Sequence, residues 1–199
     1  MEKEEIGRNK NYTKKYFLEV IEKFMSLLIP DDETEEDNFI MQQTELLMLN
    51  ISHIFKDEIS KFFVPFIHQN FVCDEITNKI GAISAFSKVI GKISESENLI
   101  KLYLDQIFHF CKYDNILLVR YCDHALSEIF LAFPQLIFDN SEKIIYFFDH
   151  TFSDHYTIFL SGQVLGVVCD VLKKREEFSN FLSSRFEGYI DILMKQLEQ

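Results

Sequence analysis

The sequence predicts an all-α protein built from repeated helical hairpins, and three observations support this fold class. Apolar residues recur at helical rather than alternating spacing over most of the 199 residues. Only six glycines and three prolines interrupt the chain. Similar pairs of predicted helices also return about every 40 residues. A chain of this length can bury a sizeable core, so we expect one domain over residues 1–199.

The first two helices flank the most acidic part of the chain. One helix is predicted over residues 12–28, because Pro30 pushes the residue before it out of the helical region. The next is predicted over residues 39–55, with Asp37 or Asn38 capping its first turn. Its apolar stripe is formed by Ile40, Leu47, Ile51 and Ile54. The segment 30–38 between these helices is therefore expected to be a loop.

The rest of the chain predicts further helices joined by short loops, which is typical of antiparallel helical hairpins. Pro65 lies inside the first of them and is expected to kink it, since proline removes a backbone donor. The charged residues 1–11 at the amino end are expected to be disordered. The further predicted helices cover residues 58–71, 74–93, 97–113, 115–133, 140–152, 154–173 and 178–196.

A repeat appears when these helices are paired. The first-helix positions are occupied by FFVPFIHQNF, YLDQIFHFCKY, KIIYFFDHTF and YIDILMKQLE. In DNILLVRYCDHALSEI, Asp114 and Arg120 are six residues apart, as in the aspartate and Val-Arg pattern of HEAT repeats. The period and helix order favour a HEAT-type α-solenoid of about four to five hairpins. The alternative is a globular helical bundle whose periodicity is accidental.

Composition limits the class of protein further. Hydrophobic residues make up 47% of the chain and charged residues 26%, which indicates a globular protein rather than a disordered or membrane-inserted one. The amino end has no apolar core of a secretory signal, so we expect the cytoplasm and nucleus. Four scattered cysteines without a C-x-x-C pair fit free thiols in a reducing compartment.

The net charge of −12 makes nucleic acid a poor partner and favours a basic protein segment. Half of this charge is concentrated in the stretch PDDETEEDNF. Carboxylates packed so closely repel each other until a Lys- and Arg-rich partner neutralises them. The alternative is a solvated loop that only keeps the protein soluble. The six carboxylates are those of Asp31, Asp32, Glu33, Glu35, Glu36 and Asp37.

The segment IPDDETEEDNFIMQQTELLMLNISHIFKDEISKFFVPFIHQNF resembles the middle of the importin-β family. In that family, one HEAT repeat carries an acidic loop ending in an aromatic residue, and the next repeat opens with a helix similar to DEISKFFVPFI. The stretches NKIGAISAFSKVIGKISES and LLVRYCDHALSEIFLAFPQLI then fall where further repeats would lie. The resemblance extends over roughly residues 13–171.

This resemblance implies a nuclear transport receptor that wraps a basic segment of importin-α or of cargo and is regulated by the GTPase Ran. It places the acidic loop among the partner-binding residues, with Phe39 where the family has a tryptophan. It also suggests that outer grooves near Phe62, Phe63 and Phe66 accept the phenylalanine–glycine repeats of pore proteins (nucleoporins). The chain has no tryptophan and is shorter than the family's members, so we expect a fragment or a reduced homologue.

Other functions find less support in the sequence. A HEAT scaffold for another assembly, such as a phosphatase, is the alternative to transport. No catalytic motif is present, so we expect neither an enzyme nor a cofactor. A zinc site is disfavoured because residues two apart on a helix point away from each other, and the cysteines are interpreted as core residues. The zinc candidates are His109, Cys111, Cys122 and His124. The polar group at residues 149–155 is interpreted as turn capping.

Overall fold

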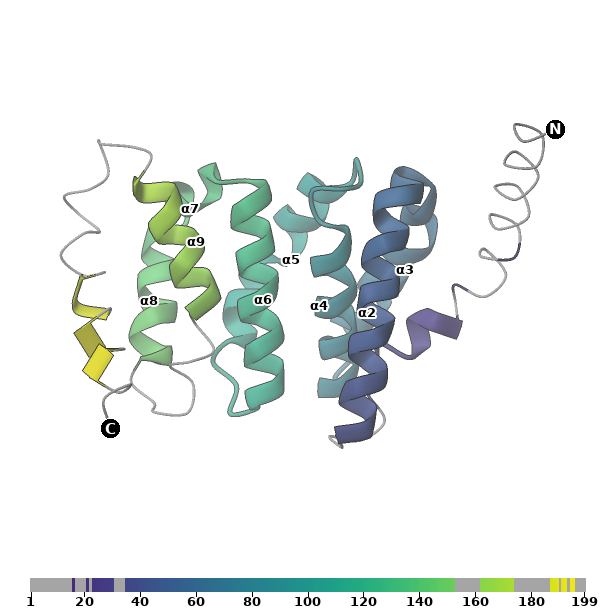
Figure 1. The fold of residues 1–199 in the computed structure, drawn as a ribbon, viewed down its shortest axis with the longest axis horizontal. Coiled ribbons are helices and arrows are strands. Elements are labelled where there is room, and N and C mark those ends of the chain that lie inside the picture. Colours follow the sequence, from purple (N-terminus) through teal and green to yellow (C-terminus); the bar gives the residue numbers. More distant parts are fainter. Residues whose placement is uncertain are drawn as a thin grey trace. The chain divides into compact units, whose positions relative to one another are not determined.

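The structure is a computed structural model that describes residues 16, 21, 23–30, 35–152, 162–173, 187–189, 191, 192, 194 and 195 (Figure 1). All regular structure within these ranges is helical, which confirms the all-α prediction. The chain divides into two units, Met1–Lys92 and Ile93–Gln199. Each unit is described by itself below. Residues 1–11, which we expect to be disordered, lie outside the described ranges.

The first unit is organised around one central helix. It contains α2 (Glu35–Phe55), the short 3-10 helix η1 (Lys56–Ile59), α3 (Ser60–Phe71) and α4 (Ile76–Val89). Helix α4 packs against both α2 and α3, and α3 and α4 form an antiparallel hairpin (Figure 1). Every residue of α4 from Lys79 onward is buried. The sequence of this part, KIGAISAFSKV, is rich in small residues, which allow neighbouring segments to pack closely against α4 on all sides.

The closest approach to α4 is made by the turn before the acidic stretch. A Cβ added to Gly81 would lie 2.8 Å from Cγ1 of Ile29 and 3.0 Å from the backbone oxygen of Leu28. Only glycine fits there without displacing the neighbouring backbone. On another side of α4, the ring of Phe86 meets that of Phe71 edge to face, with centroids 6.2 Å apart. The core of this unit is therefore built around α4.

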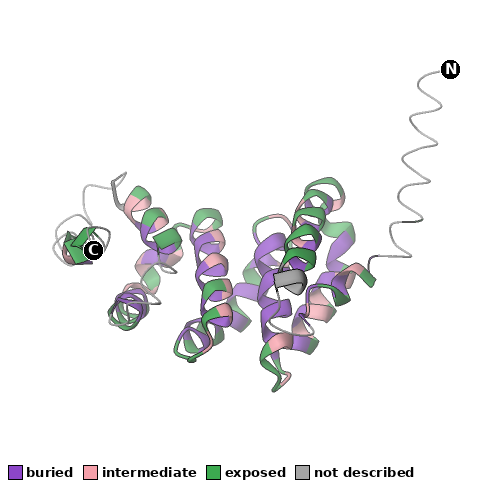
Figure 2. Ribbon diagram, turned by 60° about the horizontal axis from the view of Figure 1, so that its bottom comes forward, coloured by how far each residue is buried: buried purple, intermediate pink, exposed green. Residues whose placement is uncertain are grey.

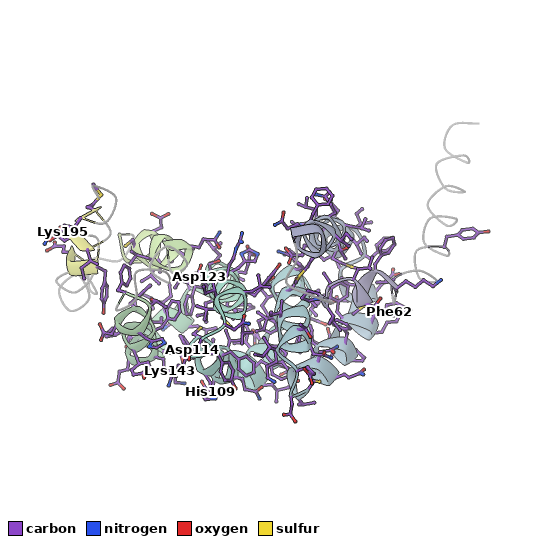
Figure 3. The ribbon with its side chains drawn as sticks, turned by 90° about the horizontal axis from the view of Figure 1, so that it is seen from below. Phe62, His109, Asp114, Asp123, Lys143 and Lys195 are labelled. Atoms are coloured by element: carbon purple, nitrogen blue, oxygen red, sulfur yellow. The ribbon has the colours of Figure 1, made fainter. Side chains whose placement is uncertain are left out.

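The second unit contains α5 (Ser96–Phe110), α6 (Ile116–Ala132), α7 (Gln135–Asp139), α8 (Ser141–Thr151) and α9 (Gly162–Lys173). Helix α6 packs against α5 and α9. The views in Figures 1 and 3 place α5 and α8 in one layer and α6 and α9 in the other. Asn115 caps α6, because its side-chain oxygen accepts a 2.8 Å hydrogen bond from the backbone nitrogen of Leu118. Figure 2 shows buried residues along the facing sides of these helices.

Several predicted boundaries differ from the structure. The helix predicted over residues 39–55 begins four residues earlier, at Glu35, so the predicted cap at Asp37 or Asn38 is wrong. The helix predicted over residues 58–71 is divided into η1 and α3, and α3 continues through Pro65. Helix α7 was not predicted. The helix predicted over residues 178–196 lies mostly outside the described residues, which hold only short helical parts of it.

Candidate functional site

Helix α2 has one face fixed by packing. The buried residues recur every three or four positions, as on one side of an α-helix, and this side faces α4. Among the predicted stripe, only Ile51 belongs to this face. The prediction of a single stripe was therefore wrong in its other three members, which are solvent-exposed. The buried residues are Met41, Thr44, Met48, Ile51 and Ser52.

The exposed side of α2 carries five apolar side chains, interspersed with the exposed polar side chains of Gln43 and Asn50, although exposed helix faces are normally mostly polar. The exposed fractions are 62% for Phe39, 55% for Leu46 and 72% for Ile54. Figure 2 shows the exposed colour along this helix. Single exposed apolar residues are common on protein surfaces, but a row of them along one helix marks a surface that another chain can cover. We call this row the α2 face, formed by Phe39, Ile40, Leu46, Leu47 and Ile54.

The acidic stretch adjoins the α2 face. Glu35, Glu36 and Asp37 are the first three residues of α2 instead of members of a loop over residues 30–38. Carboxylates at a helix amino terminus are favoured by the helix dipole, which explains why the helix extends into the acidic sequence. The remaining carboxylates, Asp31, Asp32 and Glu33, lie outside the described residues. Phe39 follows Glu35 by four residues, so the exposed apolar residues begin directly after the acidic stretch in the sequence.

A largely buried polar cluster holds α2 against α4 and so fixes the orientation of the α2 face. The ammonium of Lys88 lies 3.3 Å from Oε2 of Glu45. The hydroxyl of Ser84 donates a 2.8 Å hydrogen bond to the other carboxylate oxygen of Glu45. The hydroxyl of Ser52 donates to the backbone oxygen of Lys88 at 3.0 Å. The ion pair and these hydrogen bonds offset the cost of removing the charges of Glu45 and Lys88 from water.

The groove that the resemblance suggested near α3 is only partly accessible. Phe63 is fully buried and cannot contact a ligand, while Phe62 and Phe66 are half-buried. Figure 3 labels Phe62 on the first unit. Lys61 lies over the ring of Phe62, 5.1 Å from its centroid. Binding of phenylalanine–glycine repeats therefore stays a prediction for Phe62 and Phe66, and Phe63 is not part of the binding surface.

The four residues considered for zinc differ in burial, and the two cysteines are neighbours. Cys111 and Cys122 are buried, and the thiol of Cys111 donates a 3.2 Å hydrogen bond to the backbone oxygen of Ile107. Burial, followed by interaction with the neighbouring Cys111, raises the pKa of the Cys122 thiol. His109 is exposed on α5. Among the residues that the structure describes, no group of three potential ligands could hold a metal ion.

Asp123 is a buried carboxyl group that sequence patterns did not reveal. It lies on α6 with 3% of its surface exposed, and burial raises the pKa of its carboxyl to about 8. A hydrogen bond from the backbone of Val164 on α9 opposes this rise. Its Oδ1 has no hydrogen-bond partner among the described residues. In the sequence, only its position two residues before Ala125 and three before Leu126, both apolar, hints at burial.

No protein-family model, curated protein or solved structure matches this chain. No helix in the described part of the chain is long and apolar enough to cross a membrane. The candidate site therefore rests on the geometry of α2 and on the sequence of the acidic stretch.

Proposed function

We propose that this protein is a HEAT-type helical-repeat module that binds a basic, partly apolar segment of another protein. The observation that carries the proposal is the α2 face, an exposed apolar row that begins directly after a dense group of carboxylates in the sequence. A partner segment with lysines or arginines at one end and apolar residues along one side would match both features. The apolar contacts supply affinity, and the charges speed encounter and set orientation.

The helix contacts support a repeat architecture within each unit. In HEAT-type solenoids, the second helices of successive hairpins pack side by side. Helices α2 and α4 of the first unit, and α6 and α9 of the second, would be second helices in such a repeat, and each pair is in contact. The first helices α3 and α5 each pack against the second helix of their own hairpin. An irregular bundle would not be expected to repeat this pairing.

Within this class, we propose an importin-β-like nuclear transport receptor, or a part of one, acting between cytoplasm and nucleus. Its partners would be the basic segment of importin-α or a basic cargo, with release regulated by Ran-GTP. Because the chain has no tryptophan, stacking of tryptophans on long basic side chains is replaced in this proposal by contacts with Phe39 and Leu46. An aromatic ring at position 39 retains part of that stacking surface.

The experiment that tests this function is a binding titration with an importin-α amino-terminal basic peptide at physiological salt. The matched control peptide is a scramble of equal charge, because non-specific attraction is weak when surface charges are screened. A chain variant replaces the six carboxylates of the acidic stretch by serine and asparagine. We expect selective binding of the native peptide, loss of that selectivity in the variant, and competition by Ran-GTP.

The possible outcomes separate transport from a scaffold role. Selective binding without competition by Ran-GTP would favour a HEAT scaffold for another assembly. Equal and weak binding of both peptides would contradict recognition of basic segments altogether, and the acidic stretch would then serve solubility and the start of α2.

A further inference from the structure

A second candidate binding site lies in the other unit, where a groove of about 390 Å³ opens between α5 and α8. Figure 3 labels His109 of α5 and Lys143 of α8 on the same side of this unit, with Asp123 placed away from them. The groove is lined by Asp105, Phe108, His109, Lys112, Glu142, Lys143, Tyr146, Phe147 and His150.

The two ends of the groove differ in charge. Asp105 of α5 forms an ion pair with Lys143 of α8 at 2.5 Å, so this end is largely self-neutralised. Just beyond the end of α5, the ammonium of Lys112 lies 4.5 Å from the centroid of the Tyr146 ring of α8. Because position 105 pairs with 143 and position 112 with 146, the two helices run side by side in the same direction. The groove therefore has one end with the Asp105–Lys143 ion pair and one end with Lys112, and Glu142 is its second carboxylate.

The end with Lys112 offers unused hydrogen-bonding capacity. Lys112 has no carboxylate within ion-pair distance among the described residues, and its contact with Tyr146 leaves the three ammonium donors available. Acidic residues outnumber lysine and arginine by 32 to 20 in this chain, so a groove lysine without a carboxylate is unexpected. His109 and His150, in the last turns of their helices, line the same groove.

The walls of the groove are aromatic. Phe108 and Phe147 are buried, whereas Tyr146 is 55% exposed. An apolar side chain placed against these rings would remove apolar surface from water, which stabilises a complex by about 25 cal/mol per Å². A ligand that contacts both the aromatic rings and the ammonium of Lys112 must combine an apolar group with a nearby anion.

We propose that this groove binds a short acidic segment of a partner protein, with an aromatic or aliphatic side chain against Tyr146 and a carboxylate on Lys112. The net charge of −12 repels such a segment at long range, so short-range contacts in the groove must supply the affinity. The site differs from the α2 face in unit, in charge and in ligand. Its occupation does not depend on the binding of a basic segment to α2.

The test is a fluorescence-anisotropy titration of the whole chain with the labelled peptide GSDEFDELS. Lys112→Gln removes the cation without a large change in shape, and we expect it to weaken binding about five- to tenfold. Lys61→Gln is the matched control, because Lys61 also lies over an aromatic ring but outside the groove, and binding should stay unchanged. Tyr146→Ala should weaken binding by a similar factor.

A second measurement keeps the protein unaltered and changes the peptide. Replacing its acidic residues by Asn and Gln, or its phenylalanine by alanine, should each abolish most of the binding. Failure of the wild-type chain to bind the peptide would overturn the proposal. So would equal weakening by Lys61→Gln and Lys112→Gln, since this would indicate a general charge effect rather than a site.

Discussion

At the scale of single residues, Asp123 is the group whose charge state depends most on the fold. Its folded-state pKa of about 8 lies above the value of an exposed aspartate, so the folded protein holds a proton that the unfolded chain releases. The protonated carboxyl accommodates burial beside Val164 without a counter-ion. The contribution of this carboxyl to stability is therefore greatest below the pKa of an exposed aspartate and falls as the pH rises towards 8, where the fall levels off.

The prediction for this residue is a change in pH dependence upon Asp123→Asn. Between pH 5.5 and pH 7.5, the wild-type free energy of unfolding should fall by about 2–3 kcal/mol more than that of the variant, because the amide does not titrate. Urea unfolding at both pH values measures this difference. Identical pH dependence of the two proteins would show that the carboxyl is already ionised in the folded state.

Little of this residue-scale detail could be predicted from the sequence. Burial of Cys111 and Cys122 was predicted correctly, because small sulfur-containing side chains favour cores. Burial of Asp123 was not, since an aspartate in an amphipathic helix is normally on the solvent side. Its environment depends on the approach of α9, which is distant in the sequence.

At the scale of secondary-structure elements, the contact between α2 and α4 orients the candidate site. Glu45→Gln should lower the free energy of unfolding by about 3 kcal/mol, because Lys88 would lose its carboxylate at a position of low exposure. The double change Glu45→Leu with Lys88→Met should recover most of this loss. Denaturant titrations of the three proteins measure the effect, and a single variant as stable as the wild type would contradict the role of the ion pair.

A second element-scale prediction concerns the two glycines Gly81 and Gly166. Gly81→Ala should destabilise the protein by about 1–3 kcal/mol, although alanine favours helices, because the new methyl group meets the backbone of Leu28. Gly166→Ala in α9 is the control, with no atom within 4 Å of the added Cβ. It should leave stability unchanged or raise it by up to about 1 kcal/mol. Thermal unfolding of both variants tests the contrast, and equal effects would contradict the close packing at α4.

The elements themselves were largely predictable, but their faces were not. Apolar spacing located α4, α5, α6 and α8 to within a few residues, because regular burial imposes the helical period. Helix α2 carries apolar residues on two sides, so periodicity could not decide which side packs against α4. Its start at Glu35 also escaped prediction, because the acidic stretch was interpreted as a loop although carboxylates favour the first turn.

At the scale of the whole molecule, charge and apolar surface are distributed unevenly. Half of the net negative charge lies in one short stretch of sequence, next to an exposed apolar helix face. Such a combination favours a partner that is both basic and apolar, and a purely electrostatic attraction would fade at high salt. The proposed complex should therefore retain part of its affinity when the ionic strength is raised, through the apolar contacts of α2.

The measurement that tests the central claim most directly is titration of the importin-α basic peptide against a chain carrying Phe39→Ser and Leu46→Ser. Both side chains are mostly exposed, so the fold should be retained, while the binding surface loses its apolar character. The control chain carries Val72→Ser and Leu131→Ser, which are also exposed but lie outside α2. We predict affinity at least about tenfold weaker for the α2 variant and unchanged for the control. Equal affinity of the wild-type chain and the α2 variant would contradict the assignment of α2 as the partner-binding surface.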